Sequence, residues 1–297
     1  TLSHNKNSVN QLTGEKVQLY LADMGVKGAG SSHKIGVGEP LGQFYGYISD
    51  GLYQVSDFNY DKASGKYTLK DGIPYRGEKD KVQPGMLKFK NIDGSEDNKI
   101  TEDDKTVIGN AFPKFYGGIN NTFTYKDFDL SIFLTYSFGN DVLNATKLTN
   151  TRTALTNKNV LAAADWNHRW VTINKETDAL ITDPEELAAA NQGKTIACFD
   201  DNGSSDNAVI HSWAVEDGSY LKLSNITLGY TFPKKIVNKI GLSKLRLYAT
   251  GNNLLTWTKY TGYDPEVSTM SNAMTPGVDF GAYPRSRSFV FGVNVAF

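Results

Sequence analysis

The acidic stretch between residues 93 and 104 carries oxygen-bearing groups at the spacing of a calcium-binding loop of about 12 positions. In such loops the first, third, fifth, ninth and twelfth places bind the ion through side chains or water, and the seventh through a backbone carbonyl. Those places hold, in chain order, Asp93, Ser95, Asp97, Lys99, Thr101 and Asp104. The spacing therefore predicts a Ca²⁺ ion that stiffens a long loop.

Two positions depart from the calcium-loop pattern. The sixth place holds Asn98 instead of Gly, although Asn tolerates a left-handed backbone better than most residues. The twelfth place holds Asp104 instead of Glu, whose longer side chain reaches a bidentate geometry more easily. The alternative is an acidic surface turn that binds no ion, and the residues leave both interpretations open.

Residue patterns typical of enzymes are missing from the sequence. No Gly-x-Ser-x-Gly elbow or phosphate-binding loop occurs, and no carboxylate pair suited to glycoside hydrolysis can be named. The single Cys198 excludes an internal disulfide and a zinc site built on paired cysteines. The four histidines show no metal-ligand spacing: His4, His33, His168 and His211. We therefore expect no catalytic residues and no enzyme.

The last residues alternate between bulky apolar side chains and small or mixed ones. Because strand side chains point alternately to opposite faces, one face of this strand is predicted to be apolar. That face consists of Phe289, Phe291, Val293, Val295 and Phe297. An aromatic final strand of this kind is typical of a barrel that meets lipid on its outside. The alternative is an edge or sandwich strand packed on a soluble core.

Other strand patterns are separated by short turns and long connections. Alternation predicts a hairpin with its turn at Lys126-Asp127, and further strands are predicted at Gly42 to Tyr53, Ser219 to Phe232 and Leu245 to Trp257. Long polar connections run from Gln54 to Pro113, Asn144 to His211 and Lys259 to Arg285. The second is expected to contain helical pieces at Val160 to Trp170 and from Pro184, with Asp183 as the cap. Short turns alternating with long loops are typical of outer-membrane barrels.

Composition narrows the class of protein. No run of roughly 18 apolar residues occurs, which excludes membrane-spanning helices. The formal net charge is −1 and no basic patch stands out, so nucleic-acid binding has no electrostatic support. A mean hydropathy of −0.40 suits a barrel and a soluble protein alike. The first residues do not form a signal peptide, and for an envelope protein we expect the true start to lie upstream.

Several sequence blocks follow one another in an order and spacing that resemble a known family. They are Val37 to Gln54, Pro84 to Lys90, Thr106 to Asn110, Phe128 to Phe133, Val215 to Tyr230 and Gly251 to Val267. Together they resemble the carboxyl-terminal part of a SusC/RagA-type TonB-dependent outer-membrane transporter, and the resemblance covers nearly the whole chain. The family's usual acidic loop has Asn and Gly where this chain has Ser95 and Asn98.

The resemblance implies an all-β fold, an antiparallel transmembrane β-barrel with long extracellular loops that carry short helices. Such transporters close about 22 strands around an amino-terminal plug, of which this chain would supply roughly eight strands. Residues 1–297 are thus expected to be a carboxyl-terminal segment, with the plug and the amino-terminal strands absent. The implied setting is the outer membrane of a Gram-negative bacterium. The implied partners are a SusD-like surface lipoprotein, TonB, outer-membrane lipid and an oligosaccharide or peptide cargo.

Aromatic residues in the long connections are candidates for cargo binding, because aromatic rings stack on sugar faces. The candidates are Trp166, Trp170, Trp213 and Tyr263. The alternative for each is packing within a loop or contact with the lipoprotein. A second hypothesis for the whole chain is a soluble calcium-dependent carbohydrate-binding β-sandwich. In that fold all five residues of the apolar final-strand face would pack inward: Phe289, Phe291, Val293, Val295 and Phe297.

Overall fold

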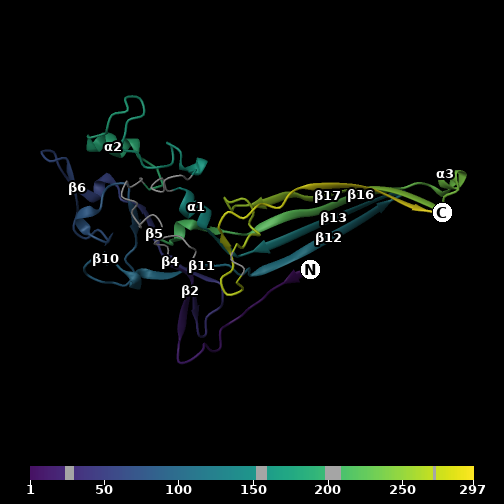
Figure 1. Ribbon diagram of the computed structural model, residues 1–297, viewed down its shortest axis with the longest axis horizontal. Coiled ribbons are helices and arrows are strands. Elements are labelled where there is room, and N and C mark those ends of the chain that lie inside the picture. The colour runs from purple at the N-terminus through teal and green to yellow at the C-terminus, as the bar shows by residue number, and fades with distance from the viewer. Residues whose placement is uncertain (24–29, 152–158, 198–208, 270–271) are drawn as a thin grey trace.

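The protein is seen in a computed structural model that describes residues 1–23, 30–151, 159–197, 209–269 and 272–297. Cys198 lies outside these residues. The described chain has two parts, a long narrow sheet and a broader group of small sheets and short helices at one end of it (Figure 1). We call the second part the loop body.

The long sheet is antiparallel and has six strands in the order β1-β12-β13-β16-β17-β19. The bounds of the strands are β1 (Leu2–Ser3), β12 (Phe115–Tyr125), β13 (Phe128–Phe138), β16 (Tyr220–Thr231), β17 (Lys244–Thr258) and β19 (Ser288–Ala296). Five of them have 9 to 15 residues. A tilted strand of about 9–11 residues suffices to cross a bilayer.

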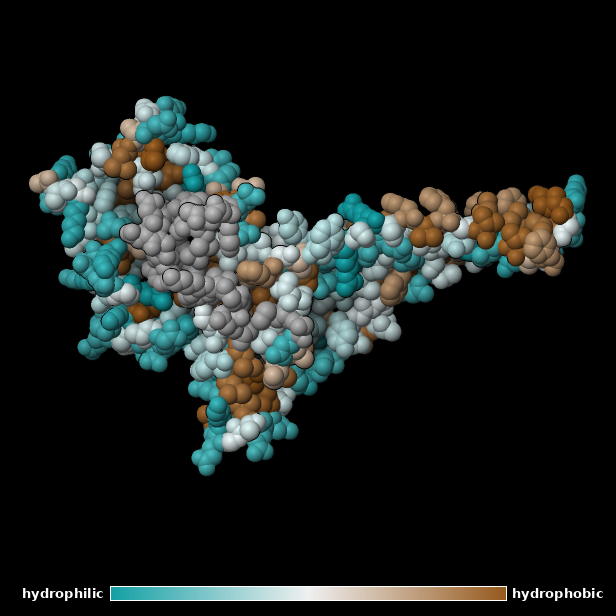
Figure 2. Space-filling view, viewed as in Figure 1, coloured by the Kyte–Doolittle hydropathy of each residue, from teal (hydrophilic) through white to brown (hydrophobic). Residues whose placement is uncertain are grey.

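One face of this sheet is apolar along its length. The pairing register places Phe123, Leu130, Leu228, Ala249 and Phe291 in a single row across the five long strands. Successive residues of a strand point to opposite faces, so the adjacent row lies on the other side of the sheet. Apolar side chains gather on the part of the sheet farthest from the loop body (Figure 2).

The opposite face of the sheet is polar and its side chains pair with one another. Its rows include Thr122, Ser131, Thr227, Thr250 and Val290. Two side-chain contacts on this face join the neighbouring strands β16 and β17: Asn225 to Asn252 (2.8 Å) and Thr227 to Thr250 (2.8 Å). A third, Asp129 to Arg246 (3.0 Å), links β13 to β17 across β16. Because these polar groups find partners within the sheet, the face can border water or a plugged interior without loss of hydrogen bonds.

Short and long connections lie at opposite ends of the sheet. The Lys126-Asp127 turn joins β12 to β13, and α3 (Lys234–Val237) with η7 (Asn238–Ile240) joins β16 to β17. α3 lies at the far tip of the sheet, together with the carboxyl terminus, whereas the long connections build the loop body at the other end (Figure 1). The asymmetry expected from the sequence is therefore present.

The loop body contains small sheets. The largest has the order β11-β4-β3-β2, and a three-stranded sheet has the order β15-β14-β18. The strands of these two sheets are β2 (Gln18–Asp23), β3 (Ser31–Gly36), β4 (Gln43–Tyr47), β11 (Lys105–Asn110), β14 (Asp141–Asn144), β15 (Val215–Asp217) and β18 (Val278–Asp279). Paired strands complete it: β5 (Ser49–Leu52) with β9 (Leu87–Phe89), β6 (Phe58–Asp61) with β7 (Lys66–Leu69), and β8 (Tyr75–Arg76) with β10 (Lys99–Ile100).

Short helices connect these strands. They are α1 (Ala145–Asn150), α2 (Pro184–Ala190), η1 (Val55–Asp57), η2 (Lys79–Lys81), η3 (Glu102–Asp104), η4 (Ala162–Ala164) and η6 (Ser212–Ala214). Asp183 caps α2 as expected, because its carboxylate accepts the backbone N–H groups of Glu185 and Glu186. Among the described residues, no helix has the length and apolar character needed to cross a membrane.

Three sequence-based expectations need correction. The strand expected from Gly42 to Tyr53 is divided between β4 and β5, which belong to different small sheets of the loop body. The long sheet accordingly has six strands in the described residues, against roughly eight expected of this part of a barrel wall. The helix expected from Val160 to Trp170 contains only the single turn η4. An apolar run is compatible with either form, and here side-chain packing decides.

Candidate functional site

The acidic loop is closed by hydrogen bonds from its backbone N–H groups to the side chain of Asp104. Asp104 is fully buried, and its carboxylate accepts the N–H groups of Ile92 (2.8 Å), Asp93 (3.3 Å) and Thr101 (2.8 Å). Thr101 in turn caps η3 with its hydroxyl. Both oxygens of Asp104 are thus committed to hydrogen bonds that close the loop.

The other predicted ligands form local turns. The carboxylate of Asp93 accepts the N–H of Ser95 (2.7 Å), and that of Asp97 accepts the N–H of Lys99 (3.0 Å). Asn98 has a φ of 55°, the left-handed conformation that the sixth place of a calcium loop demands. In the described parts of the chain, no group of three or more His, Cys, Asp or Glu side chains is gathered for a metal ion.

The buried carboxylate yields a stability prediction. Asp104→Ala is expected to destabilise the loop by about 1–3 kcal/mol, because three backbone donors lose a charged acceptor. Asp103→Ala is the matched control, since the Asp103 side chain is exposed. Limited proteolysis between residues 91 and 104 should be faster for Asp104→Ala alone. Equal cleavage rates for the two variants would contradict this role.

Two of the four candidate aromatic residues are engaged in packing. Trp170 is 2% exposed and packs in a core with Leu52, Ile181 and Leu187. Gly85 lies against its indole with a φ of 88°, and a Cβ there would come within 2.5 Å of the ring. Trp166 is half-buried, and the guanidinium of Arg169 lies 5.6 Å from its ring centre. Trp170 thus has the packing role that the sequence left open.

The other two aromatic residues, Trp213 and Tyr263, line one cleft of about 400 Å³. We call it the aromatic cleft. It lies between α1, the Leu161 to Ala163 segment, the Thr195-Ile196 segment and the turn that carries Tyr263. Tyr263 is 70% exposed, whereas Trp213 is half-buried. The structure therefore brings together two candidates that are 50 residues apart in the sequence.

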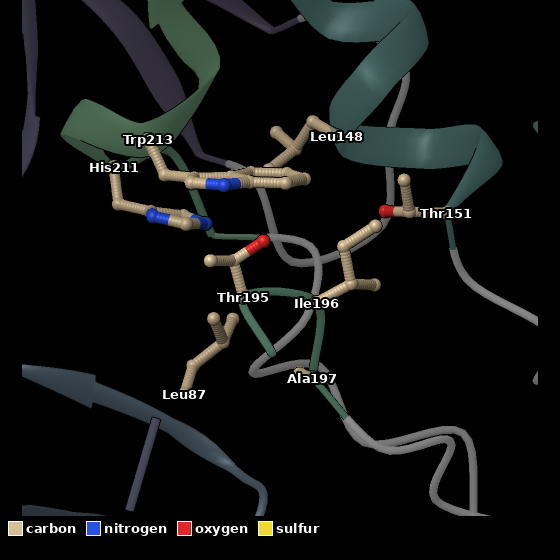
Figure 3. A pocket seen from close by; sticks show the side chains of 8 residues that line it. All are labelled: Leu87, Leu148, Thr151, Thr195, Ile196, Ala197, His211 and Trp213. Atoms are coloured by element: carbon tan, nitrogen blue, oxygen red, sulfur yellow. The ribbon is translucent and has the colours of Figure 1, made fainter. Parts of the chain in front are cut away.

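A small pocket of about 20 Å³ adjoins the aromatic cleft and shares four residues with it: Thr151, Thr195, Ile196 and Trp213. The rings of His211 and Trp213 lie parallel there, 5.8 Å apart and inclined by 9° (Figure 3). His211 is buried, and its Nδ1 has no partner among the described residues. Burial, reinforced by the charge of Lys147, lowers the pKa of His211 to about 3, so the ring is neutral near pH 7.

Lys147 lines the aromatic cleft, and its positive charge is paired with the carboxylate of Glu216. Its ammonium donates to the Trp213 carbonyl (3.0 Å), pairs with Glu216 (3.0 Å) and lies 4.1 Å from the Trp213 ring centre. Burial would raise the pKa of Glu216, but hydrogen bonds from Thr261 and Lys147 hold it below its usual value. Sequence analysis missed this pair because the two residues lie in different connections, with no shared motif.

The last long connection is anchored to the polar face of the long sheet. Glu266 accepts hydrogen bonds from Lys222 and Tyr220 of β16, and Arg285 lies 3.4 Å from the same carboxylate. The Lys222 side chain is 4% exposed. Burial by itself would raise the pKa of Glu266, but the Lys222 and Tyr220 hydrogen bonds hold it below its ordinary value of 4.5.

This anchor is expected to depend on pH. A carboxyl whose pKa is depressed in the folded state stabilises it fully above the unfolded-state value of 4.5, and this stabilisation is lost as pH falls through the folded-state pKa. Glu266→Gln should weaken the anchor at neutral pH by about 1–3 kcal/mol, because Lys222 then lacks a counter-charge. Hydrogen exchange of residues 259–285 measures this, with the exposed Glu96→Gln as control. Exchange in Glu266→Gln that matches the control at neutral pH would refute the anchor.

The five residues predicted to form the apolar face of the final strand are exposed. Phe289, Phe291, Val293, Val295 and Phe297 are 68%, 81%, 60%, 45% and 93% exposed. They share the apolar face of the long sheet with Leu228 and Leu247. A sandwich would bury this row between two sheets. Exposed apolar rows of this extent mark a surface that meets lipid or another apolar partner.

Comparisons with known proteins agree with this fold. TonB-dependent receptor P3 of Formosa agariphila is 33% identical over 265 residues, which cover 88% of this chain and 22% of the receptor. TonB-dependent receptor SusC of Bacteroides thetaiotaomicron is 26% identical over 208 residues, covering 69% of this chain and 17% of SusC. The chain therefore spans about a fifth of the length of these relatives.

The same architecture occurs in a solved transporter. The structure of the RagAB peptide transporter matches all of this chain and 26% of its own chain, with a TM-score of 0.61 and 21% identity. No family model matches the sequence. The two-faced antiparallel sheet, the loops gathered at one end and these relatives lead to one conclusion: the chain belongs to the SusC/RagA-type TonB-dependent receptors.

Proposed function

We propose that this chain forms part of the barrel wall and the outer loops of a TonB-dependent transporter in the outer membrane of a Gram-negative bacterium. The observation that carries the proposal is the division of the long sheet into an apolar face and a polar, internally bonded face. In a membrane the first face meets hydrocarbon and the second lines the interior. The loop body then lies on the outer side, where cargo arrives.

The transporter imports an oligosaccharide or a peptide. RagAB is a peptide transporter, and this chain shares its fold. A SusD-like surface lipoprotein is the proposed partner at the loop body. TonB would deliver energy through a plug and amino-terminal segments belonging to the longer protein of which this chain is a part. Cargo of this size cannot cross a bilayer, so the outer loops hold it before entry.

Uptake in the native organism tests the proposal. Cells that carry the full-length protein should accumulate a fluorescent peptide or oligosaccharide, and deletion of its gene or of tonB should abolish the accumulation. A gene deletion that leaves uptake of both probe classes unchanged would contradict import by this protein. Uptake that persists without tonB would contradict the energy source.

Calcium binding by the acidic loop is a separate proposal. The spacing of the six predicted donors and the left-handed Asn98 support it, whereas the commitment of Asp104 to backbone N–H groups favours a loop without an ion. Calorimetric titration of the full-length protein with Ca²⁺ decides between them. Heat release that Asp97→Ala abolishes would support the ion. Absence of heat, with unchanged proteolysis of the loop, would reject it.

A further inference from the structure

Several of the polar groups that line the aromatic cleft are already hydrogen-bonded to one another or to their immediate neighbours. The Asn144 amide oxygen accepts the N–H of Lys147 (2.8 Å), and the Thr151 hydroxyl donates to the Lys147 carbonyl (2.9 Å). The Thr261 hydroxyl donates to Glu216 (2.8 Å), which also neutralises Lys147. The polar rim therefore offers few unused partners to the hydroxyl groups of a sugar.

Most of the wall left open to a ligand is apolar, with Thr195 and His168 as further polar side chains in the lining. Trp213 and Tyr263 supply aromatic surface from two sides, and Leu161, Ala163 and Ile196 supply aliphatic surface. Ligand pockets of roughly 300–1,000 Å³ with mostly apolar walls are typical of binding sites, and this cleft has about 400 Å³. His211, in the pocket behind Trp213, is neutral and adds no charge.

From these contacts we infer that the aromatic cleft receives an aliphatic or aromatic side chain of a peptide cargo. The inference rests on the proposed function and names the cargo class of that same transporter. An apolar side chain gains free energy by leaving water for the cleft, and the bonded groups of the rim keep their hydrogen bonds when water is displaced. A sugar would bury several hydroxyl groups there with few partners, which opposes its binding.

Binding to the purified full-length transporter in detergent tests the inference. The probes are heptapeptides of glycine and serine that carry Phe, Leu or Ser at the central position, together with maltoheptaose. Calorimetry should show that the Phe and Leu peptides bind at least about tenfold more tightly than the Ser peptide, because only they bury an apolar side chain. Equal affinity for the three peptides would overturn the inference.

A substitution that fills the cleft supplies the second arm. Ala163 is exposed at the cleft wall, and Ala163→Trp should weaken binding of the Phe peptide by about tenfold or more. Ala189→Trp, at an exposed alanine of α2 outside the cleft, should leave it unchanged. Tyr263→Phe should retain binding and Tyr263→Ala should weaken it, since ring surface and not the hydroxyl makes the contact.

Four further results would overturn the inference. Maltoheptaose binding that Ala163→Trp abolishes would assign the cleft to sugars. Loss of the lipoprotein from the complex in Ala163→Trp, with peptide affinity unchanged, would assign it to that partner. TonB-dependent uptake of the Phe peptide that Ala163→Trp does not reduce would leave the proposed function standing and refute the cleft alone. Absence of any TonB-dependent uptake would refute both.

Discussion

Phe291→Arg is expected to prevent assembly of the full-length protein in the outer membrane, whereas Val290→Arg is expected to be tolerated. The two residues are neighbours on β19 but lie on opposite faces of the long sheet. An Arg on the lipid-facing side near mid-membrane costs about 2–4 kcal/mol, whereas a lumen-facing substitution mainly changes selectivity. Phe291 is near the middle of the nine-residue strand, where this cost is largest.

Membrane fractionation and heat-modifiable migration on gels measure this difference. Wild type and Val290→Arg should fractionate with the outer membrane and migrate as folded barrels without boiling. Phe291→Arg should be degraded or found unfolded. If both variants assemble equally well, the apolar row does not face lipid. A protein that stays soluble and folded without detergent would favour the alternative of a soluble β-sandwich.

Trp170→Ala is expected to destabilise the loop body by about 3–5 kcal/mol, the usual cost of removing a large buried aromatic side chain. The indole fills the core beside Leu187 and Ile181, and it lies against Gly85. Its removal leaves a cavity that α2 and the neighbouring strands cannot close completely. Binding at the aromatic cleft is affected only through the loss of local order.

Trp166→Ala is the matched control, because Trp166 is half-buried and its ring contact is with Arg169. Hydrogen exchange in residues 170–190 should increase strongly for Trp170→Ala and little for Trp166→Ala. The opposite ranking would show that Trp166 holds the loop body together. Unchanged exchange in Trp170→Ala, combined with lost cargo binding, would return Trp170 to the cargo-binding candidates.

Phe291→Arg tests the long sheet and Trp170→Ala tests the loop body. These two parts differ in how much of their structure can be predicted from neighbouring residues in the sequence. In the regular stretches of the long sheet the side chains obey one period, since each strand has only two faces, and the register shifts only near Phe133 and Leu223. Alternation in Phe128 to Phe138 and in Ser288 to Ala296 therefore predicts the strands, their faces and the tight turn between β12 and β13. The cap at Asp183 was predictable for the same reason, because capping depends on neighbouring residues only.

The sequence by itself thus determined the two-faced strands, the order of short and long connections and the family resemblance. Tertiary structure alone decided that Gly42 to Tyr53 divides between two small sheets, that Trp170 is core, and that Trp213 and Tyr263 meet in one cleft. The physical reason is the separation in sequence over which the two kinds of interaction act. Alternation and caps act between residues a few positions apart, whereas a cleft or a core is made by contacts between segments whose separation in sequence carries no period.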